Sequence, residues 1–428
     1  MNAVGVPAPA ANPAAVLEHI RPGTNLIVPS ENGEPATLLD AIEAAASGLE
    51  RVTVHQALAV RDRPHHAGAF GDRLRHISYF LTVPMRDHHD RGTVELMPND
   101  LSSIPAILRA SAPDPLLIAA VSPPDRHGFV SLGSSAAYAA ALLGEVPVFA
   151  EVNRRMPRTA GRNQIHLSRV LGWVEADYPL ASPPAVPITD TDRAIAAHVA
   201  ERIPHGATLQ IGVGAVPDAV AGLLSSHRDL GIHSELLADG LRRLIECGAA
   251  TGALKRQDRF QAITTIAFGS PDLYPFLDEN RHVQFWPCDE SNDVRVIASH
   301  PNFCAVNATM QVDLLGQCAS ESLGSHYISS SGGQADFMRG ASRSDGGQAF
   351  IVTHATAVNG TISRIQPTLS PGAVVTTHKN LMDKVVTEHG VAELRGRTIR
   401  QRALALIAIA APQFRAELRA GAERLGYV

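Results

Sequence analysis

Short apolar runs recur along the chain and alternate with longer stretches in which apolar residues return every three or four positions. Runs rich in Val, Ile and Leu without polar alternation are typical of strands that are buried on both faces of a parallel sheet. Residues 51–55, 115–121 and 146–152 are such runs, and residues 208–211 begin a second series. The pattern predicts an α/β fold in which helices cover parallel sheets.

An internal repeat divides the chain. The pattern that begins at Ile20 returns at Ile203, 183 positions later, and each copy contains an apolar strand, a glycine turn, a proline and an apolar helix. The repeat predicts two related open α/β domains with a cleft between them. The proline-rich stretch 179–187 is the expected linker. We therefore expect a flexible tail over residues 1–15, an N-terminal domain over 16–184 and a C-terminal domain over 185–428.

Composition narrows the class of protein. The 428 residues carry a net charge of −5, which gives no strong field for nucleic acid or an acidic membrane. No apolar run reaches the roughly 18 residues of a membrane span, and the first fifteen residues lack the pattern of a signal peptide. The four cysteines show neither metal-ligand nor secreted-disulfide spacing, so we expect a cytoplasmic protein.

The start of the second copy contains the strongest candidate for chemistry. Gly212 and Gly214 follow the strand and permit a tight turn close to a ligand. Further on, Ser234 is a suitable N-cap and Glu235 is expected in the first turn of the next helix, since the leucines that follow have roughly helical spacing. A carboxylate at this position is either a cap that complements the helix dipole or a positioned nucleophile.

The glycine turn and Glu235 together resemble the acetyl-CoA hydrolase/transferase family, the class I CoA-transferases that include 4-hydroxybutyrate and acetate CoA-transferases. Further stretches match the family in order and spacing, so that the resemblance covers roughly residues 18 to 425. These stretches are residues 122–133, 151–159, 306–317, 329–337 and 385–396.

The resemblance implies an enzyme that moves CoA from an acyl-CoA to a free carboxylic acid. Glu235 would attack the thioester and form an acyl-glutamyl anhydride, and then a glutamyl-CoA thioester. The helix N-terminus would keep Glu235 ionised. The amide of Asn292 and the backbone N–H of Gly333 would stabilise the oxyanions, and a second backbone donor is expected near Gln56 or Ala57.

The resemblance also implies a binding surface for the CoA moiety. Coenzyme A and acyl-CoA are expected as substrates, with no tightly bound cofactor, no metal, and a homo-oligomer (dimer or tetramer) as the assembly. The polar stretch Ser329 to Phe337 is expected to be a mobile loop that closes over CoA. The implied contacts with CoA are Gln210, Ile211, Gly212, Val213, Gly214, Met310, Gly333 and Gln334.

Several positions depart from the family pattern. The family has a glycine and a cysteine where this chain has Glu31 and Asn32, Tyr-Ser-Gly before Gly-Gly-Gln where it has Ile328 to Ser331, and an aromatic residue where it has His389. The family's Ser-Val-Asp is a Ser-Ser-Ala that begins at Ser134. The resemblance assigns these positions to the acyl pocket and its rim, so the choice of substrate does not transfer with the reaction.

Two other functions remain open. One is acyl-CoA hydrolysis by the same glutamate, with water in place of the acceptor acid. The other is a CoA-binding protein without turnover, which the presence of Glu235 disfavours.

Three arginines and two histidines have open roles. Arg154, Arg155 and Arg158 form either a solvated basic loop or a site for a substrate carboxylate or CoA phosphates. His127 and His166 lack neighbours that would complete a metal site, and are expected in core or turn positions.

Overall fold

The computed structural model describes residues 7–184 and 186–428, which form two compact units. Unit 1 contains the chain up to Pro183 together with Ile263–Ser291, and unit 2 contains Pro184–Ala262 and Asn292–Val428. The sequence predicts a single boundary near residue 185, whereas in the structure residues 263–291 also belong to unit 1. The reason is hydrogen bonding, because β16 (Val283–Phe285) pairs in parallel with β8 (Ala160–Gly161) of unit 1.

Unit 1 is built on a seven-stranded sheet whose neighbouring strands all run parallel. Each of the three apolar runs predicted in this half overlaps a strand of the sheet. In spatial order the strands are β10 (Gly172–Ala176), β7 (Val148–Asn153), β5 (Pro115–Val121), β1 (Asn25–Val28), β2 (Val52–Ala57), β3 (Leu74–Phe80) and β4 (Val94–Leu96).

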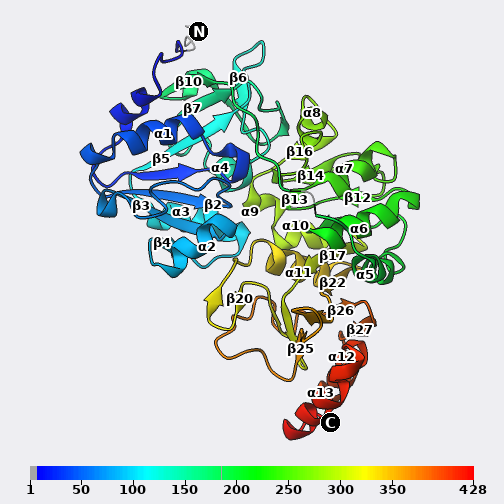
Figure 1. Cartoon of the computed structure of the whole chain (residues 1–428). Coiled ribbons are helices and arrows are strands. Elements are labelled where there is room, and N and C mark those ends of the chain that lie inside the picture. The colour runs from blue at the N-terminus through cyan, green and yellow to red at the C-terminus, as the bar shows by residue number, and fades with distance from the viewer. Residues whose placement is uncertain (1–6, 185) are drawn as a thin grey trace. The chain divides into compact units, whose positions relative to one another are not determined.

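The core of unit 1 lies between this sheet and its helices. Leu38, Leu39 and Ile42 of α1 pack with Leu26 of β1 and Val54 of β2, and all five are fully buried. Figure 1 shows α1 lying along the blue and cyan strands of the sheet. The helices of this unit are α1 (Ala36–Ala44), α2 (Val83–Asp90), α3 (Ile104–Ser111), α4 (Ala137–Ala141), α8 (Leu273–Leu277) and α9 (Cys288–Ser291).

The described part of the expected N-terminal tail is attached to the sheet. Residues 1–6 lie outside the described residues. The indole N–H of Trp173, on β10, donates to the carbonyl of Pro7 at 2.8 Å, and the backbone N–H of Ala10 donates to the carbonyl of Trp173. Pro13–His19 then form a 3₁₀ helix that begins at an Asn12 cap. From Pro7 onward the chain is therefore part of unit 1.

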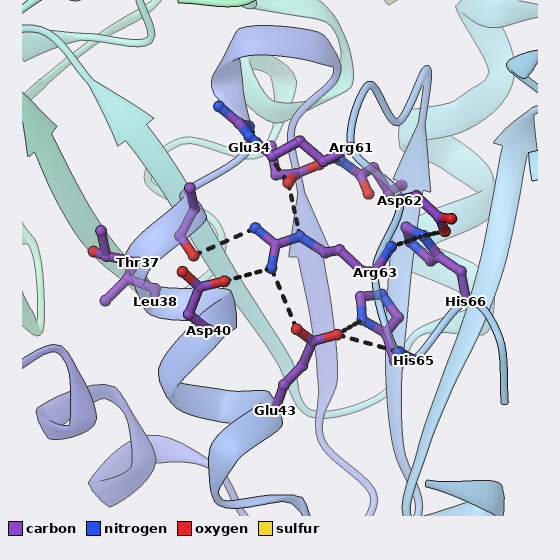
Figure 2. A network of polar contacts seen from close by, with 12 residues as sticks. Glu34, Thr37, Leu38, Asp40, Glu43, Arg61, Asp62, Arg63, His65 and His66 are labelled. Atoms are coloured by element: carbon purple, nitrogen blue, oxygen red, sulfur yellow. Dashed lines mark hydrogen bonds and ion pairs between the residues drawn. The ribbon is translucent and has the colours of Figure 1, made fainter. Parts of the chain in front are cut away.

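A polar network centred on the buried Arg63 joins the segment after β2 to α1, as Figure 2 shows. The guanidinium of Arg63 contacts Glu34 at 2.8 Å, Asp40 at 2.9 Å and Glu43 at 3.3 Å. Glu34 also accepts a hydrogen bond from the side chain of Gln56 at 3.0 Å. Because Arg63 and Glu34 are both buried, each charge depends on the other for its stability in the protein interior.

Unit 2 contains a six-stranded sheet that is parallel except at one edge. Strands β26 and β27 pair antiparallel, which a short hairpin between them allows. In spatial order the strands are β12 (Gly231–Ile232), β11 (Thr208–Ile211), β17 (Phe303–Ala308), β22 (Gln348–Val352), β26 (Lys384–Thr387) and β27 (Gly390–Glu393).

Phe303 of β17 and Phe337 of α11 stack in the core of unit 2, with ring centroids 6.0 Å apart. The C-terminal helices, red in Figure 1, add Leu406 and Leu418 to this core. The helices are α5 (Asp190–Ala200), α6 (Ala215–Leu223), α7 (Asp239–Glu246), α10 (Val294–Ser299), α11 (Gln334–Arg343), α12 (Ile399–Ile409) and α13 (Arg415–Arg424). Within the described part of the chain, every helix is too short or too polar to cross a membrane.

Candidate active site

The glycine turn of unit 2 forms as the sequence predicts. Strand β11 ends at Ile211, and Gly214 then caps α6 with a φ of 119°, a conformation that favours glycine. Pro217 lies in the first turn of α6, which its fixed φ suits. Val213 at the tip of the turn is 57% exposed, and a side chain at Gly214 would meet no protein atom within 4 Å. The turn therefore presents an open stretch of backbone.

Glu235 is not in the first turn of a helix, and that prediction is wrong. Helix α7 begins only at Asp239, and Leu236–Leu237 form a short strand, β13. The hydroxyl of Ser234 donates to the carbonyl of Leu236 at 2.9 Å and does not cap a helix. The same hydroxyl reaches the carbonyl of Ile211 at 3.4 Å, which brings Glu235 next to the glycine turn.

Two neutral donors converge on the carboxyl group of Glu235. The side-chain amide of Asn292, just before α10, donates to Oε2 at 3.0 Å. The backbone N–H of Gly333, the N-cap of α11, also bonds to this carboxyl group. A Cβ atom on residue 333 would collide with Glu235 Oε2 and Asn292 Nδ2, so only glycine allows this approach. The structure thus brings together the three residues expected to be catalytic.

The protonation of Glu235 is controlled by burial. Desolvation of the carboxyl group raises the pKa of Glu235 from its ordinary value of 4.5 to about 7. The negative charge of Asp336 adds to the rise, while the hydrogen bonds from Asn292 and Gly333 oppose it. The expected stabilisation by the start of Glu235's own helix is therefore absent. The helix N-terminus that approaches this carboxyl group belongs to α11.

The stretch Ser329 to Phe337 is only partly a loop. Helix α11 begins at Gln334, and Phe337 is fully buried in the core of unit 2. Ser329 to Gly333 therefore form the loop, and the rest is a packed first turn. The sequence prediction missed this turn because the stretch is mostly polar and Phe337 is its only large apolar residue.

The other expected CoA contacts have varied surroundings. Gln210 and Asn307 exchange side-chain hydrogen bonds of 2.9 and 3.2 Å between neighbouring strands β11 and β17. The amide of Gln334 donates to Thr377 at 3.0 Å and to the sulfur of Cys318 at 3.4 Å. The side chains of Gln210 and Gln334 thus make hydrogen bonds within unit 2.

The remaining expected contacts lie in and beside the turn. Ile211 is buried, Met310 is partly exposed, and the N–H of Gly212 donates to the carbonyl of Val306 at 3.0 Å.

Two residues near the site are missing from the sequence predictions. Asp336 is buried in the first turn of α11 and acts on the carboxyl group of Glu235 through its charge. Asn307 holds Gln210 in place. The only signal for Asp336 was its position three residues after Gly333, and nothing in the sequence marks Asn307 as the partner of Gln210.

The candidate arginines of unit 1 all have carboxylate partners. Arg154 pairs with Glu175 at 2.8 Å, Arg155 with Asp177 at 2.7 Å and Arg158 with Glu279 at 2.6 Å. These pairs favour the solvated-loop interpretation.

The remaining polar candidates of unit 1 also have hydrogen-bond partners. His166 lies in a turn region, as expected, and its Nε2 is 2.8 Å from the carbonyl oxygen of His127. The backbone N–H of Ala57, one candidate for the second oxyanion donor, bonds to the hydroxyl of Tyr138 at 3.0 Å.

Comparison with known proteins identifies the family. Residues 10–188 match the model of the acetyl-CoA hydrolase/transferase N-terminal domain, and residues 269–422 match the model of the C-terminal domain. This chain belongs to the acetyl-CoA hydrolase/transferase family. The solved structure of RipA from Yersinia pestis superimposes with a TM-score of 0.93 at 34% identity and covers 98% of both chains. The solved structure of a 4-hydroxybutyrate CoA-transferase from Porphyromonas gingivalis superimposes with a TM-score of 0.81 at 34% identity and covers 97% of both chains, so the two-domain α/β architecture is that of a CoA-transferase.

Curated relatives define the kind of enzyme. Succinyl-CoA:cyclohexane-1-carboxylate CoA transferase of Geobacter metallireducens is 40% identical over 97% of this chain and 95% of its own length. The 4-hydroxybutyrate coenzyme A transferase of Clostridium kluyveri is 38% identical over 90% of each chain. An acetyl-CoA hydrolase of Schizosaccharomyces pombe is more distant, with 28% identity over 56% of this chain. The protein is a CoA-transferase.

Proposed function

We propose that this CoA-transferase moves CoA between small carboxylic acids through covalent intermediates on Glu235. The observation that carries the proposal is the convergence of Asn292 and Gly333 on the Glu235 carboxyl group. Neutral donors hold a carboxylate in place without the ion pair that would make it unreactive. They are also the groups that stabilise an oxyanion.

The first step is attack by a carboxylate oxygen of Glu235 on the thioester carbonyl carbon. The tetrahedral intermediate collapses by breaking the carbon–sulfur bond, which gives the acyl-glutamyl anhydride and CoA thiolate. The pKa of about 7 means that a substantial fraction of Glu235 is ionised at neutral pH and that the ionised carboxylate is a stronger nucleophile than an ordinary one.

The second step is the return of CoA thiolate to the glutamyl carbonyl carbon of the anhydride. The negative charge then develops on an oxygen of Glu235 itself, where Asn292 Nδ2 and the Gly333 N–H already point. Collapse releases the first carboxylic acid as its carboxylate and leaves a glutamyl-CoA thioester. An acceptor carboxylate attacks this thioester, and the same steps in reverse release the new acyl-CoA.

The open turn at Gly212–Gly214 supports the binding of the CoA arm beside Glu235. Its exposed backbone and the exposed Val213 side chain suit contact with an extended, partly apolar chain such as pantetheine. The relatives named for succinyl-CoA, cyclohexane-1-carboxylate and 4-hydroxybutyrate support small carboxylic acids as donors and acceptors. The departures from the family at Glu31 and Ser329 to Ser331 leave the individual acids to experiment.

A trapping experiment tests the covalent mechanism. The enzyme is incubated with acetyl-CoA without an acceptor, and intact-protein and peptide mass spectrometry are used to find a CoA thioester on Glu235. Borohydride, which reduces thioesters and spares free carboxylates, should inactivate the enzyme only after acyl-CoA is added. Steady-state kinetics with an added acid should be ping-pong.

The control is Glu246→Gln, which removes an exposed acid of α7 and should form the adduct like the wild type. Sequential kinetics with no adduct would refute the covalent mechanism. Release of CoA and free acid at the same rate with or without an acceptor would indicate hydrolysis.

A further inference from the structure

Three histidines of unit 1 form a compact buried cluster far along the chain from Glu235. His65 and His66 lie in the segment after β2, and His76 lies on β3. We refer to these three residues as the histidine cluster. All three are at most 1% exposed, and their ring centroids are separated by 4.2 to 5.4 Å.

The nitrogen atoms of the histidine cluster have the spacing of metal ligands. Each ring offers one nitrogen, and the three atoms lie within 4.8 Å of one another. Nε2 of His65 and Nδ1 of His76 are 3.3 Å apart. In a tetrahedral site with bonds of about 2.0–2.1 Å to nitrogen, two ligand atoms are about 3.3–3.4 Å apart. One edge of such a site is therefore already present.

Glu43 of α1 gives His65 the orientation of a metal ligand. Its Oε1 accepts from Nδ1 of His65 at 2.6 Å, and Figure 2 shows this contact beside the ion pair of Glu43 with Arg63. With the proton on Nδ1, Nε2 of His65 presents a lone pair to the cluster. A carboxylate behind a histidine is a common support of metal ligands.

Hydrogen bonds do not account for the whole cluster. Nδ1 of His66 lies 3.2 Å from the backbone N–H of Arg63, whereas Nε2 of His66 is buried and has no hydrogen-bond partner among the described residues. Nε2 of His76 is also buried without such a partner. Buried imidazole nitrogens without partners are unusual unless another group engages them.

We propose that His65, His66 and His76 bind one divalent transition-metal ion of the Zn²⁺ type. Three imidazoles and no oxygen ligand favour such an ion over Mg²⁺ or Ca²⁺, and three protein ligands leave a fourth position for water. The ion would join the segment after β2 to β3, with α1 attached through Glu43. Its role is to stabilise unit 1, and it is independent of the chemistry proposed for Glu235.

Cobalt binding to the full-length protein tests the site. The enzyme is stripped with a strong chelator and titrated with Co²⁺, whose visible absorption is intense in tetrahedral coordination. We expect about one equivalent of Co²⁺ with this absorption, and its displacement by Zn²⁺. Zn²⁺ should also raise the melting temperature of the stripped wild type.

Variants separate the cluster from other histidines. His76→Gln should abolish the tetrahedral absorption. Glu43→Gln keeps all three ligands and should weaken binding on the order of ten- to a hundredfold, as loss of such a support does. The control is His205→Gln, because His205 and His227 are also paired, with ring centroids 4.9 Å apart, but lack a third neighbour among the groups that the structure describes.

Two results would overturn the proposal. One is wild-type protein that shows no saturable tetrahedral Co²⁺ site, a result that needs no variant. The other is a site that persists unchanged in folded His76→Gln protein. If His76→Gln does not fold, the affinity of Glu43→Gln decides, because equal affinity in that variant and the wild type would also contradict the proposal.

Discussion

The first strand, turn and helix of unit 1 and of unit 2 are arranged in the same order, but the two turns differ in their exposure. In unit 1 the turn after β1 is buried, and a side chain at Gly33 would meet Pro29 and Ser135. In unit 2 the turn after β11 is open at Val213 and Gly214. The same backbone motif is thus buried in unit 1 and exposed in unit 2.

The buried carboxylates near the two turns differ in the same way. Glu34 is neutralised by the guanidinium of Arg63 at 2.8 Å, whereas Glu235 is held by an amide and a backbone N–H. An ion pair stabilises the carboxylate and makes it a poor nucleophile. Burial raises the pKa of Glu235 to about 7, and the hydrogen bonds from the two neutral donors oppose this rise only in part, so the ionised form is a reactive anion. This difference supports a structural role for Glu34 and the role proposed for Glu235 as the nucleophile.

The largest effect should come from Glu235→Gln. The amide is nearly isosteric but cannot form the anhydride, so kcat/KM should fall by at least about a thousandfold, the scale on which loss of a nucleophile acts. Initial rates of acyl transfer measure the effect, with Glu246→Gln as the control that should keep wild-type rates. A rate within tenfold of wild type would assign the nucleophile elsewhere.

Removing Arg63, the cation that pairs with Glu34, should lower the stability of the protein. Arg63→Met leaves Glu34 buried without its main partner, which costs about 3 to 5 kcal/mol in the free energy of unfolding. The exposed pair of Arg154 and Glu175 provides the control, because Arg154→Met should cost less than about 1 kcal/mol. Urea denaturation measures both, and equal losses would show that the burial of the Arg63 pair is unimportant.

Gly333→Ala tests the donors around Glu235. The added methyl group collides with the carboxyl group and moves it away from the N–H, so kcat should fall on the order of a hundred- to a thousandfold. KM for acyl-CoA should change much less. Gly222→Ala is the control, since a side chain there meets nothing within 4 Å. A rise in KM for acyl-CoA with unchanged kcat would instead indicate a role in binding alone.

The raised pKa of Glu235 should also make the free energy of unfolding depend on pH. A group whose pKa rises on folding, here from 4.5 to about 7, stabilises the protein fully below about pH 4.5 and loses this contribution as the pH rises through 7. Glu235→Gln should therefore be more stable than wild type above pH 7, by about 1 to 3 kcal/mol. The difference should vanish below pH 4.5. Thermal unfolding across this range would contradict the assignment if the difference were constant.

The smallest effect concerns the pH dependence of activity. Because the carboxylate is the attacking form, kcat/KM should fall as the pH drops below about 7. Asp336→Asn removes a negative charge that raises the pKa of Glu235, so the fall should move to lower pH. This shift is measured by following kcat/KM, or the pre-steady-state rate, as a function of pH. Asp190→Asn, at an exposed position on α5, should leave the profile in place, and a shift common to both variants would reflect general charge alone.

The fold was largely accessible from sequence because its strands are continuous apolar runs. Burial on both faces leaves little choice of structure for residues 115–121 or 208–211. The start of α7 was misplaced because Leu236 and Leu237 fit a helical spacing and a strand equally well. Local pattern could not separate the two, and tertiary contacts decided.

The site was accessible only in part. The resemblance proposed Glu235, Asn292 and Gly333, and the structure brings these residues together from three distant segments that no local pattern connects. The pKa of Glu235 depends on burial and on Asp336, and neither can be read from the sequence alone. The histidine cluster was missed for the same reason, because the pairing of β2 with β3 determines which residues His76 meets.

The discontinuous construction of unit 1 has a consequence for synthesis on the ribosome. Its last segment, Ile263–Ser291, follows the first part of unit 2 in the chain. At about 5 to 20 residues per second, the intervening stretch of about 80 residues takes roughly 4 to 16 seconds to translate. During this interval β8 emerges without β16, its parallel partner. A nascent chain arrested before residue 263 should therefore be a good target for chaperones.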